Sequence, residues 1–120
     1  MVNINYRDPK PLYEQVKEGF RRLIVSGVFG ENGKLPSVRE LAAELAINPN
    51  TIQRAYRELE SEGYIYSISG KGSFVSERKE LNELSRNRLL SRFDALVSEL
   101  GLEGVFGDEL CRRIKEVEQR

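Results

Sequence analysis

The sequence contains no histidine and only one cysteine, Cys111. Without histidine there is no Ser/His or Cys/His nucleophile pair, and nearly every zinc-binding pattern is excluded. A single cysteine cannot form a disulfide within the chain, and we expect Cys111 to be a small buried apolar side chain. We therefore predict that the protein is not an enzyme and holds no metal and no cofactor.

Long apolar runs and an excess of one charge are also missing. The first residues, MVNINYRDPK, lack the apolar stretch of a secretory signal, so we predict a cytoplasmic protein with no membrane partner. Nineteen basic residues balance nineteen acidic ones over 120 residues. Many nucleic-acid-binding proteins are basic overall. Any positive surface must therefore come from local arrangement.

Three short helices are predicted in the first half of the chain. Apolar residues recur at helical spacing over residues 11–26. Ser37 and Glu40 have the spacing of a capping box, which places a second helix after Ser37. Asn48 and the proline after it are typical of a helix start, and this third helix is expected to end near Glu62.

A β-hairpin and two further helices are predicted to follow. Residues 64–68 and 73–75 are rich in strand-forming side chains, and the glycines between them favour a turn. Helical spacing returns over residues 78–100, and again from about Asp108 to the end. The fold class is therefore mainly α with a small antiparallel hairpin. We predict a winged helix-turn-helix domain over residues 1–76 and a helical dimerisation region over residues 77–120.

In this fold the third helix is the one that enters the major groove of DNA. Its first turns carry side chains suited to base edges: Asn50, Thr51, Gln53 and Arg54. Asn and Gln pair with adenine and Arg with guanine, each worth roughly 1 to 3 kcal/mol of discrimination. Lys71 lies in the hairpin turn. The alternative for the helix is an ordinary solvated face.

Four segments of the sequence resemble the N-terminal domain of the GntR family of bacterial transcription regulators. They are PLYEQVKEGFRRLIVSG, LPSVRELAAEL, NPNTIQRAYRELESEGYI and GKGSFV. The short remainder resembles the tail of the YtrA-like subfamily, whose two helices serve dimerisation. The resemblance implies DNA contacts from Arg39, Asn48, Asn50, Thr51, Gln53, Ser69 and Gly70. Arg54, Arg57 and Lys71 are added from their positions on the helix and the turn, and the alternative for Arg39 is an ion pair with a neighbour such as Glu44.

The apolar stripes of the last two helices predict a homodimer interface, because two amphipathic helices alone cannot bury them. The candidates are Phe93, Leu96, Leu100, Leu110 and Ile114, with packing on the first helix as the alternative. A two-fold dimer matches a palindromic operator in double-stranded DNA. We predict a repressor, with a winged-helix protein-interaction module as the alternative; whether a small molecule binds stays open.

Overall fold

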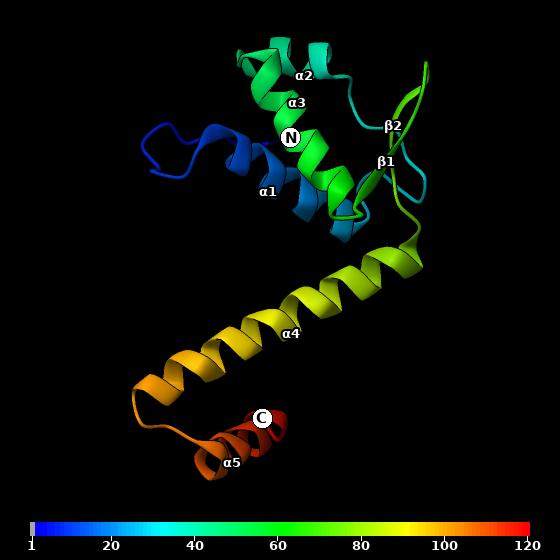
Figure 1. Cartoon of the computed structure of the whole chain (residues 1–120). Coiled ribbons are helices and arrows are strands. Elements are labelled where there is room, and N and C mark those ends of the chain that lie inside the picture. The colour runs from blue at the N-terminus through cyan, green and yellow to red at the C-terminus, as the bar shows by residue number, and fades with distance from the viewer. Residues whose placement is uncertain (1) are drawn as a thin grey trace. The chain divides into compact units, whose positions relative to one another are not determined.

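The computed structural model describes residues 2–120. Within them the chain forms five helices and one two-stranded sheet (Figure 1). The predicted fold class, mainly α with a small antiparallel hairpin, is confirmed. The elements are α1 (Leu12–Ser26), α2 (Val38–Leu45), α3 (Pro49–Ser61), β1 (Ile65–Ile68), β2 (Gly72–Val75), α4 (Arg78–Leu102) and α5 (Gly107–Glu118).

The two predicted helix starts in the middle of this order are capped, although the capping box at Ser37 forms only in part: within residues 2–120 the Glu40 side chain does not bond back to the Ser37 N–H. The Ser37 hydroxyl accepts a hydrogen bond from the backbone N–H of Glu40 at 3.1 Å, at the start of α2. The Asn48 side-chain oxygen accepts one from the backbone N–H of Asn50 at 2.8 Å, at the start of α3. Each cap satisfies an N–H group that the helix itself leaves unpaired.

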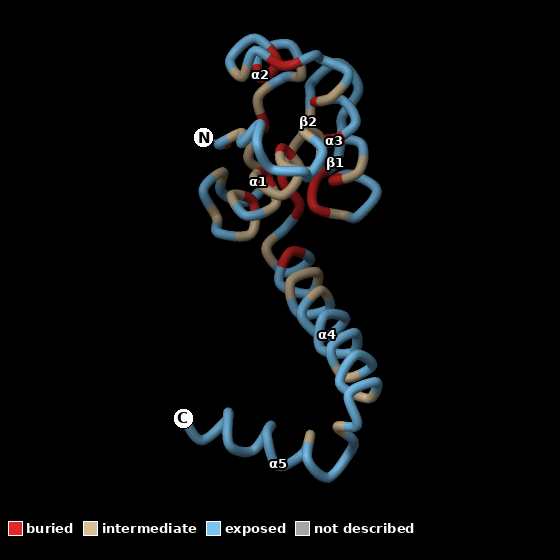
Figure 2. The backbone as a smooth tube through the Cα atoms, turned by 90° about the vertical axis from the view of Figure 1, so that its left-hand side faces the viewer, coloured by how far each residue is buried: buried red, intermediate tan, exposed pale blue. Residues whose placement is uncertain are grey.

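One apolar core joins α1, α2, α3 and the hairpin with the segments that connect them, and it includes Leu81 in the first turns of α4. Figure 2 shows the buried residues gathered in this part of the chain. The inward face of α3 is apolar, and its four residues recur at helical spacing and are all buried. They are Ile52, Ala55, Tyr56 and Leu59. The Tyr56 hydroxyl also donates a 2.7 Å hydrogen bond to the carbonyl of Pro36, which ties α3 to the segment before α2.

The hairpin is antiparallel, with Ile65 opposite Val75 and Ile68 opposite Gly72. The extended segment before α2 adds to its outer edge. The backbone N–H of Leu35 donates to the Ser73 carbonyl at 2.9 Å, and Lys34 forms a bridge with Phe74. The hairpin and this segment together form the wing of the domain, which is therefore wider than the two strands that the sequence predicted.

The structure divides into two compact units, residues 1–84 and 85–120. The first unit extends eight residues beyond the boundary placed at residue 76, because the first turns of α4 pack on the winged core. Leu81 is 1% exposed, and Leu84 lies against the core. The Arg78 guanidinium also donates a 2.8 Å hydrogen bond to the Val25 carbonyl at the end of α1.

The second unit consists of the remainder of α4 and of α5. The expected helix end near Leu100 falls two residues early, because the helix passes through Gly101 and ends at Leu102. The prediction that Cys111 is buried is wrong, since its side chain is exposed. It follows Leu110, and successive helical residues are turned by about 100°. The half-buried face of α5 at Leu110 therefore leaves Cys111 outside.

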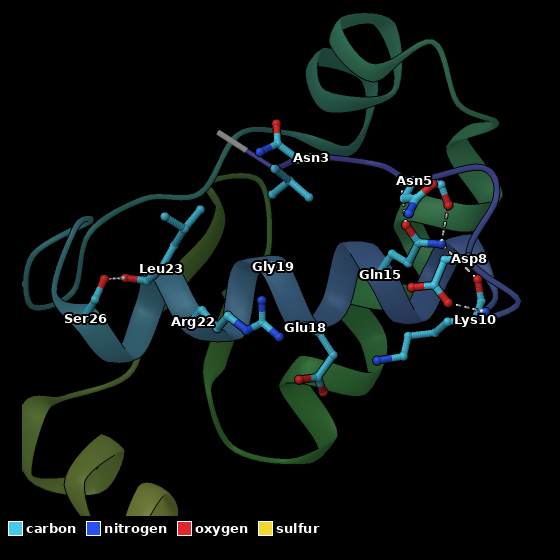
Figure 3. Close-up of a pocket in the computed structure, with 11 residues that line it drawn as sticks. Asn3, Asn5, Asp8, Lys10, Gln15, Glu18, Gly19, Arg22, Leu23 and Ser26 are labelled. Atoms are coloured by element: carbon cyan, nitrogen blue, oxygen red, sulfur yellow. Dashed lines mark hydrogen bonds between the residues drawn. The ribbon is translucent and has the colours of Figure 1, made fainter.

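The segment before α1 is held against that helix by a side chain that the sequence did not single out. The Gln15 amide accepts a hydrogen bond from the Asn5 N–H at 2.8 Å and donates to the carbonyls of Asn5 and Lys10. Val2 is buried over Gly19, where a Cβ atom would lie only 2.8 Å from the valine Cγ1. Figure 3 shows Gln15 beneath this segment, with Gly19 farther along α1.

Candidate nucleic-acid interface

The connection between α2 and α3 is a tight turn centred on Ala46. This residue is left-handed, with φ 54° and ψ 45°, and it ends α2. The next N–H, that of Ile47, returns to the Ala42 carbonyl at 3.0 Å, while the Ile47 side chain is buried. The turn therefore satisfies the last carbonyls of α2 and fixes where α3 begins.

The first turns of α3 present polar side chains to solvent, as the sequence predicted. Asn48, Asn50 and Gln53 are exposed, and Thr51 is half-buried. Arg39 is exposed near the start of α2, and no carboxylate of residues 2–120 forms an ion pair with it. The ion pair with Glu44 that was the alternative for Arg39 is therefore not formed in the described chain.

Arg54 is engaged by its neighbours. Its guanidinium carbon lies 3.6 Å from the centre of the Tyr13 ring, a cation–π contact with α1. Its Nε lies 3.4 Å from the Glu58 carboxylate one helical turn later. The Arg54 side chain remains 57% exposed, so both contacts leave part of the guanidinium open to a ligand.

Acidic residues gather in the second half of α3 and directly after it, where a lysine from α1 reaches two of them. Lys17 Nζ is 3.1 Å from the Glu58 carboxylate and is also paired with Glu62. The hydrogen bond from Lys17 holds the pKa of Glu58 below its usual value. Burial lowers the pKa of Lys17, but the two carboxylates raise it by more, so the net shift is upward. The charges of α3 are thus divided, with polar and basic groups first and paired acids last.

The wing ends in an exposed turn of Ser69, Gly70 and Lys71. Gly70 has φ 76°, a left-handed value that suits glycine. The N–H of Lys71 donates to the Ile68 carbonyl at 2.9 Å, which closes the turn. Tyr66 and Phe74 stack across the strands with ring centroids 5.7 Å apart, so the strands that carry the turn are braced by side chains.

Tyr13 and Lys34 belong to this surface and were missed by the sequence interpretation. Tyr13 was read only as part of a helix, although an aromatic ring near an arginine-bearing helix is a recurrent partner for guanidinium. Lys34 lies between the first two predicted helices and was not among the candidate residues. Both acquire their places through contacts between residues far apart in the chain.

A polar hollow of about 490 Å³ lies between the N-terminal segment and α1 (Figure 3). It is lined by groups of both charges, including Asp8, Lys10 and Arg22. Nowhere in residues 2–120 do three or more His, Cys, Asp or Glu side chains gather as a metal site would require. Over the same residues, no helix is both long enough and apolar enough to cross a membrane.

The second unit has an apolar groove of about 360 Å³ between α4 and α5. All five residues predicted for a dimer interface line it. They are Phe93, Leu96, Leu100, Leu110 and Ile114. Phe93 is 45% exposed and Leu96 is 53% exposed, so the two helices leave much of this apolar surface uncovered.

The model of the family described as "Bacterial regulatory proteins, gntR family" matches residues 12–75. These residues include α2, α3 and the hairpin turn, which form the candidate nucleic-acid interface. The chain belongs to the GntR family. It is a DNA-binding transcription regulator and not an enzyme. The similarity continues beyond the matched region. The HTH-type transcriptional repressor YtrA of Bacillus subtilis (strain 168) is 36% identical over 119 residues, which are 98% of this chain and 92% of the relative.

Solved structures of GntR regulators have the same fold. A GntR family transcriptional regulator from Listeria monocytogenes superimposes with a TM-score of 0.71 at 34% identity, covering 91% of this chain and 96% of its own. The DNA-binding domain of AraR in complex with operator ORE1 gives a TM-score of 0.55 at 32% identity, over 63% of this chain and 93% of that one. Operator binding is thus seen directly in a protein with this domain.

Proposed function

We propose that this GntR protein is a repressor that binds a palindromic operator in double-stranded DNA as a homodimer, in the cytoplasm where operator DNA lies. The observation that carries the proposal is the exposed polar face at the start of α3, which follows directly on the turn from α2. A single α-helix fits the major groove of B-DNA, and its first turns reach the base edges.

Within this interface the side chains divide into those that read bases and those that bind the backbone. Asn50 and Gln53 are the candidates for adenine, and Arg54 for guanine. Arg39 is the candidate for phosphate, together with the wing turn at Lys71. The remaining candidates contribute smaller polar groups or backbone N–H groups. They are Asn48, Thr51, Ser69 and Gly70.

The dimer would form through the apolar groove between α4 and α5. A two-fold interface uses the same patch on both subunits, so each groove would receive apolar side chains from the other copy. Burying a leucine or phenylalanine side chain completely is worth roughly 1.5 to 3 kcal/mol. Four of the five residues on each chain are exposed and Leu110 is partly buried, so covering them from both chains would favour association.

The test of DNA binding is fluorescence anisotropy with the duplex upstream of the protein's own coding sequence, against an unrelated duplex. The wild-type protein should bind the first more tightly, with an affinity that falls steeply as salt rises. Arg39→Ala should weaken this binding strongly while leaving the circular dichroism spectrum unchanged. Arg22→Ala, an exposed arginine of α1, is the matched control. Equal affinity for the two duplexes would instead favour a protein-interaction module.

The test of the dimer is sedimentation equilibrium. Leu96→Asp places a charge in the groove and should convert the dimer to a monomer, with a parallel loss of operator affinity. Ser98→Asp is the control, because Ser98 is exposed on the same helix and does not line the groove. A wild-type protein that sediments as a monomer at micromolar concentration would refute the dimer.

A further inference from the structure

The orientation of the Lys34 side chain is set by the pairing of its backbone with the wing. It lies on the extended segment before α2, where it bridges Phe74 of β2. Successive residues of a strand point to opposite faces. Val75 is buried in the core, so Phe74 and its partner Lys34 lie on the face turned away from the core. The side chain of Lys34 is accordingly exposed.

Gly72 provides the space that this lysine occupies. A Cβ atom at Gly72 would lie 2.9 Å from Cε of Lys34 and 3.7 Å from its Nζ. The φ angle of Gly72 is also +114°, in a region that favours glycine. The aliphatic part of the Lys34 side chain therefore crosses β2 at Gly72. Its ammonium group lies beside Gly72, which is the next residue after Lys71 of the turn.

The ammonium group has no acidic partner. Within residues 2–120, no carboxylate forms an ion pair with Lys34, whereas Lys17 and Arg54 are each paired with Glu58. Lys71 is likewise unpaired in the described chain. In a protein with equal numbers of acidic and basic residues, two unneutralised lysines beside one turn form a local positive site.

We propose that Lys34 binds a DNA phosphate together with Lys71, so that two cations, one from the segment before α2 and one from the hairpin turn, hold the wing on the DNA backbone. This inference rests on the proposed function. An ammonium group is a point charge that binds phosphate without reading sequence. Lys34 should therefore set affinity and its salt dependence, and leave base discrimination to α3.

The test uses Lys34→Gln, which keeps most of the stem over Gly72 and removes the charge. Each phosphate contact contributes about 0.9 to the slope of log affinity against log salt. The slope should become shallower by about 0.9 for each bound protomer. The affinity in 0.1 M salt should fall roughly tenfold for each protomer, by the same factor on the upstream and the unrelated duplex.

Two further variants make the result specific. Lys34→Arg keeps a cation and should restore most of the slope. Lys79→Gln removes an exposed lysine of α4 and should leave the slope unchanged. The proposal is overturned if the Lys34→Gln slope equals that of the wild type, or if only the upstream duplex loses affinity, as a base-reading residue would require. A wild-type protein without preference for the upstream duplex would refute the proposed function itself, which is a separate result.

Discussion

Replacing Ala46 with glycine should stabilise the protein, although glycine usually weakens a helical protein. Ala46 is held at φ 54° and ψ 45°, where a Cβ atom is crowded by the following carbonyl. This conformation costs a residue other than glycine roughly 1 to 2 kcal/mol. Ala46 is exposed, so its methyl group contributes little packing.

The gain is reduced by the freedom that glycine adds to the unfolded chain, about 0.4 to 1 kcal/mol. The expected net effect is a rise of about 0.5 to 1 kcal/mol in the free energy of unfolding. In a chain of this size it should appear as an increase of roughly 2 to 4 °C in Tm. Urea denaturation measures the change in the free energy of unfolding. The protein concentration must be the same for both proteins, because the stability of a dimer depends on concentration.

The matched control is Ala43→Gly, the same chemical change three residues earlier. Ala43 is exposed within α2, where glycine costs up to about 1 kcal/mol. The two variants should therefore shift the urea midpoint in opposite directions. The reasoning would be refuted if Ala46→Gly lowered stability as much as Ala43→Gly does.

Three further predictions concern the packing of the first unit. Tyr56→Phe removes a partly buried hydrogen bond and should lower the free energy of unfolding by about 1 to 1.5 kcal/mol in urea. The pKa of Glu58 is lowered in the folded protein, so Glu58 contributes to the free energy of unfolding above about pH 4.5, and this contribution is lost as the pH falls further. Lys17→Met removes the main cause of the lowered pKa. In a pH series, the free energy of unfolding of this variant should therefore fall less steeply in acid than that of the wild type. An equally steep loss of stability in acid in the variant and in the wild type would contradict this. Leu81→Ala should cost about 2 to 5 kcal/mol because Leu81 is fully buried, whereas Leu102→Ala, at a residue 89% exposed, should change stability by less than about 0.5 kcal/mol.

Local chemistry accounts for what the sequence predicted well. The starts of α2 and α3 follow from Ser37 and Asn48, whose side chains bind N–H groups two or three residues away. The inward face of α3 follows from helical spacing. The exposed polar face at the start of the same helix is the remainder of that pattern. Such signals are contained in a few neighbouring residues.

The features that were missed depend on contacts between distant parts of the chain. Leu81 packs on the core of the first unit, beyond the domain boundary that was predicted at residue 76. Lys34 joins the wing by pairing with a residue 40 positions later. Arg54 meets a ring from α1. None of these pairings leaves a periodic or capping signal in one sequence, because each depends on how the helices and strands pack.

The stacking of Arg54 on Tyr13 has a consequence for the energetics of recognition. A free arginine side chain loses conformational entropy worth up to about 2 kcal/mol when it is fixed on a ligand. Here the Tyr13 ring and the Glu58 carboxylate already restrict the guanidinium in the unbound protein, so part of this cost is met during folding. In the proposed interface the Arg54 side chain is therefore preorganised for binding, and substitution of Tyr13 on α1 should change operator affinity through Arg54.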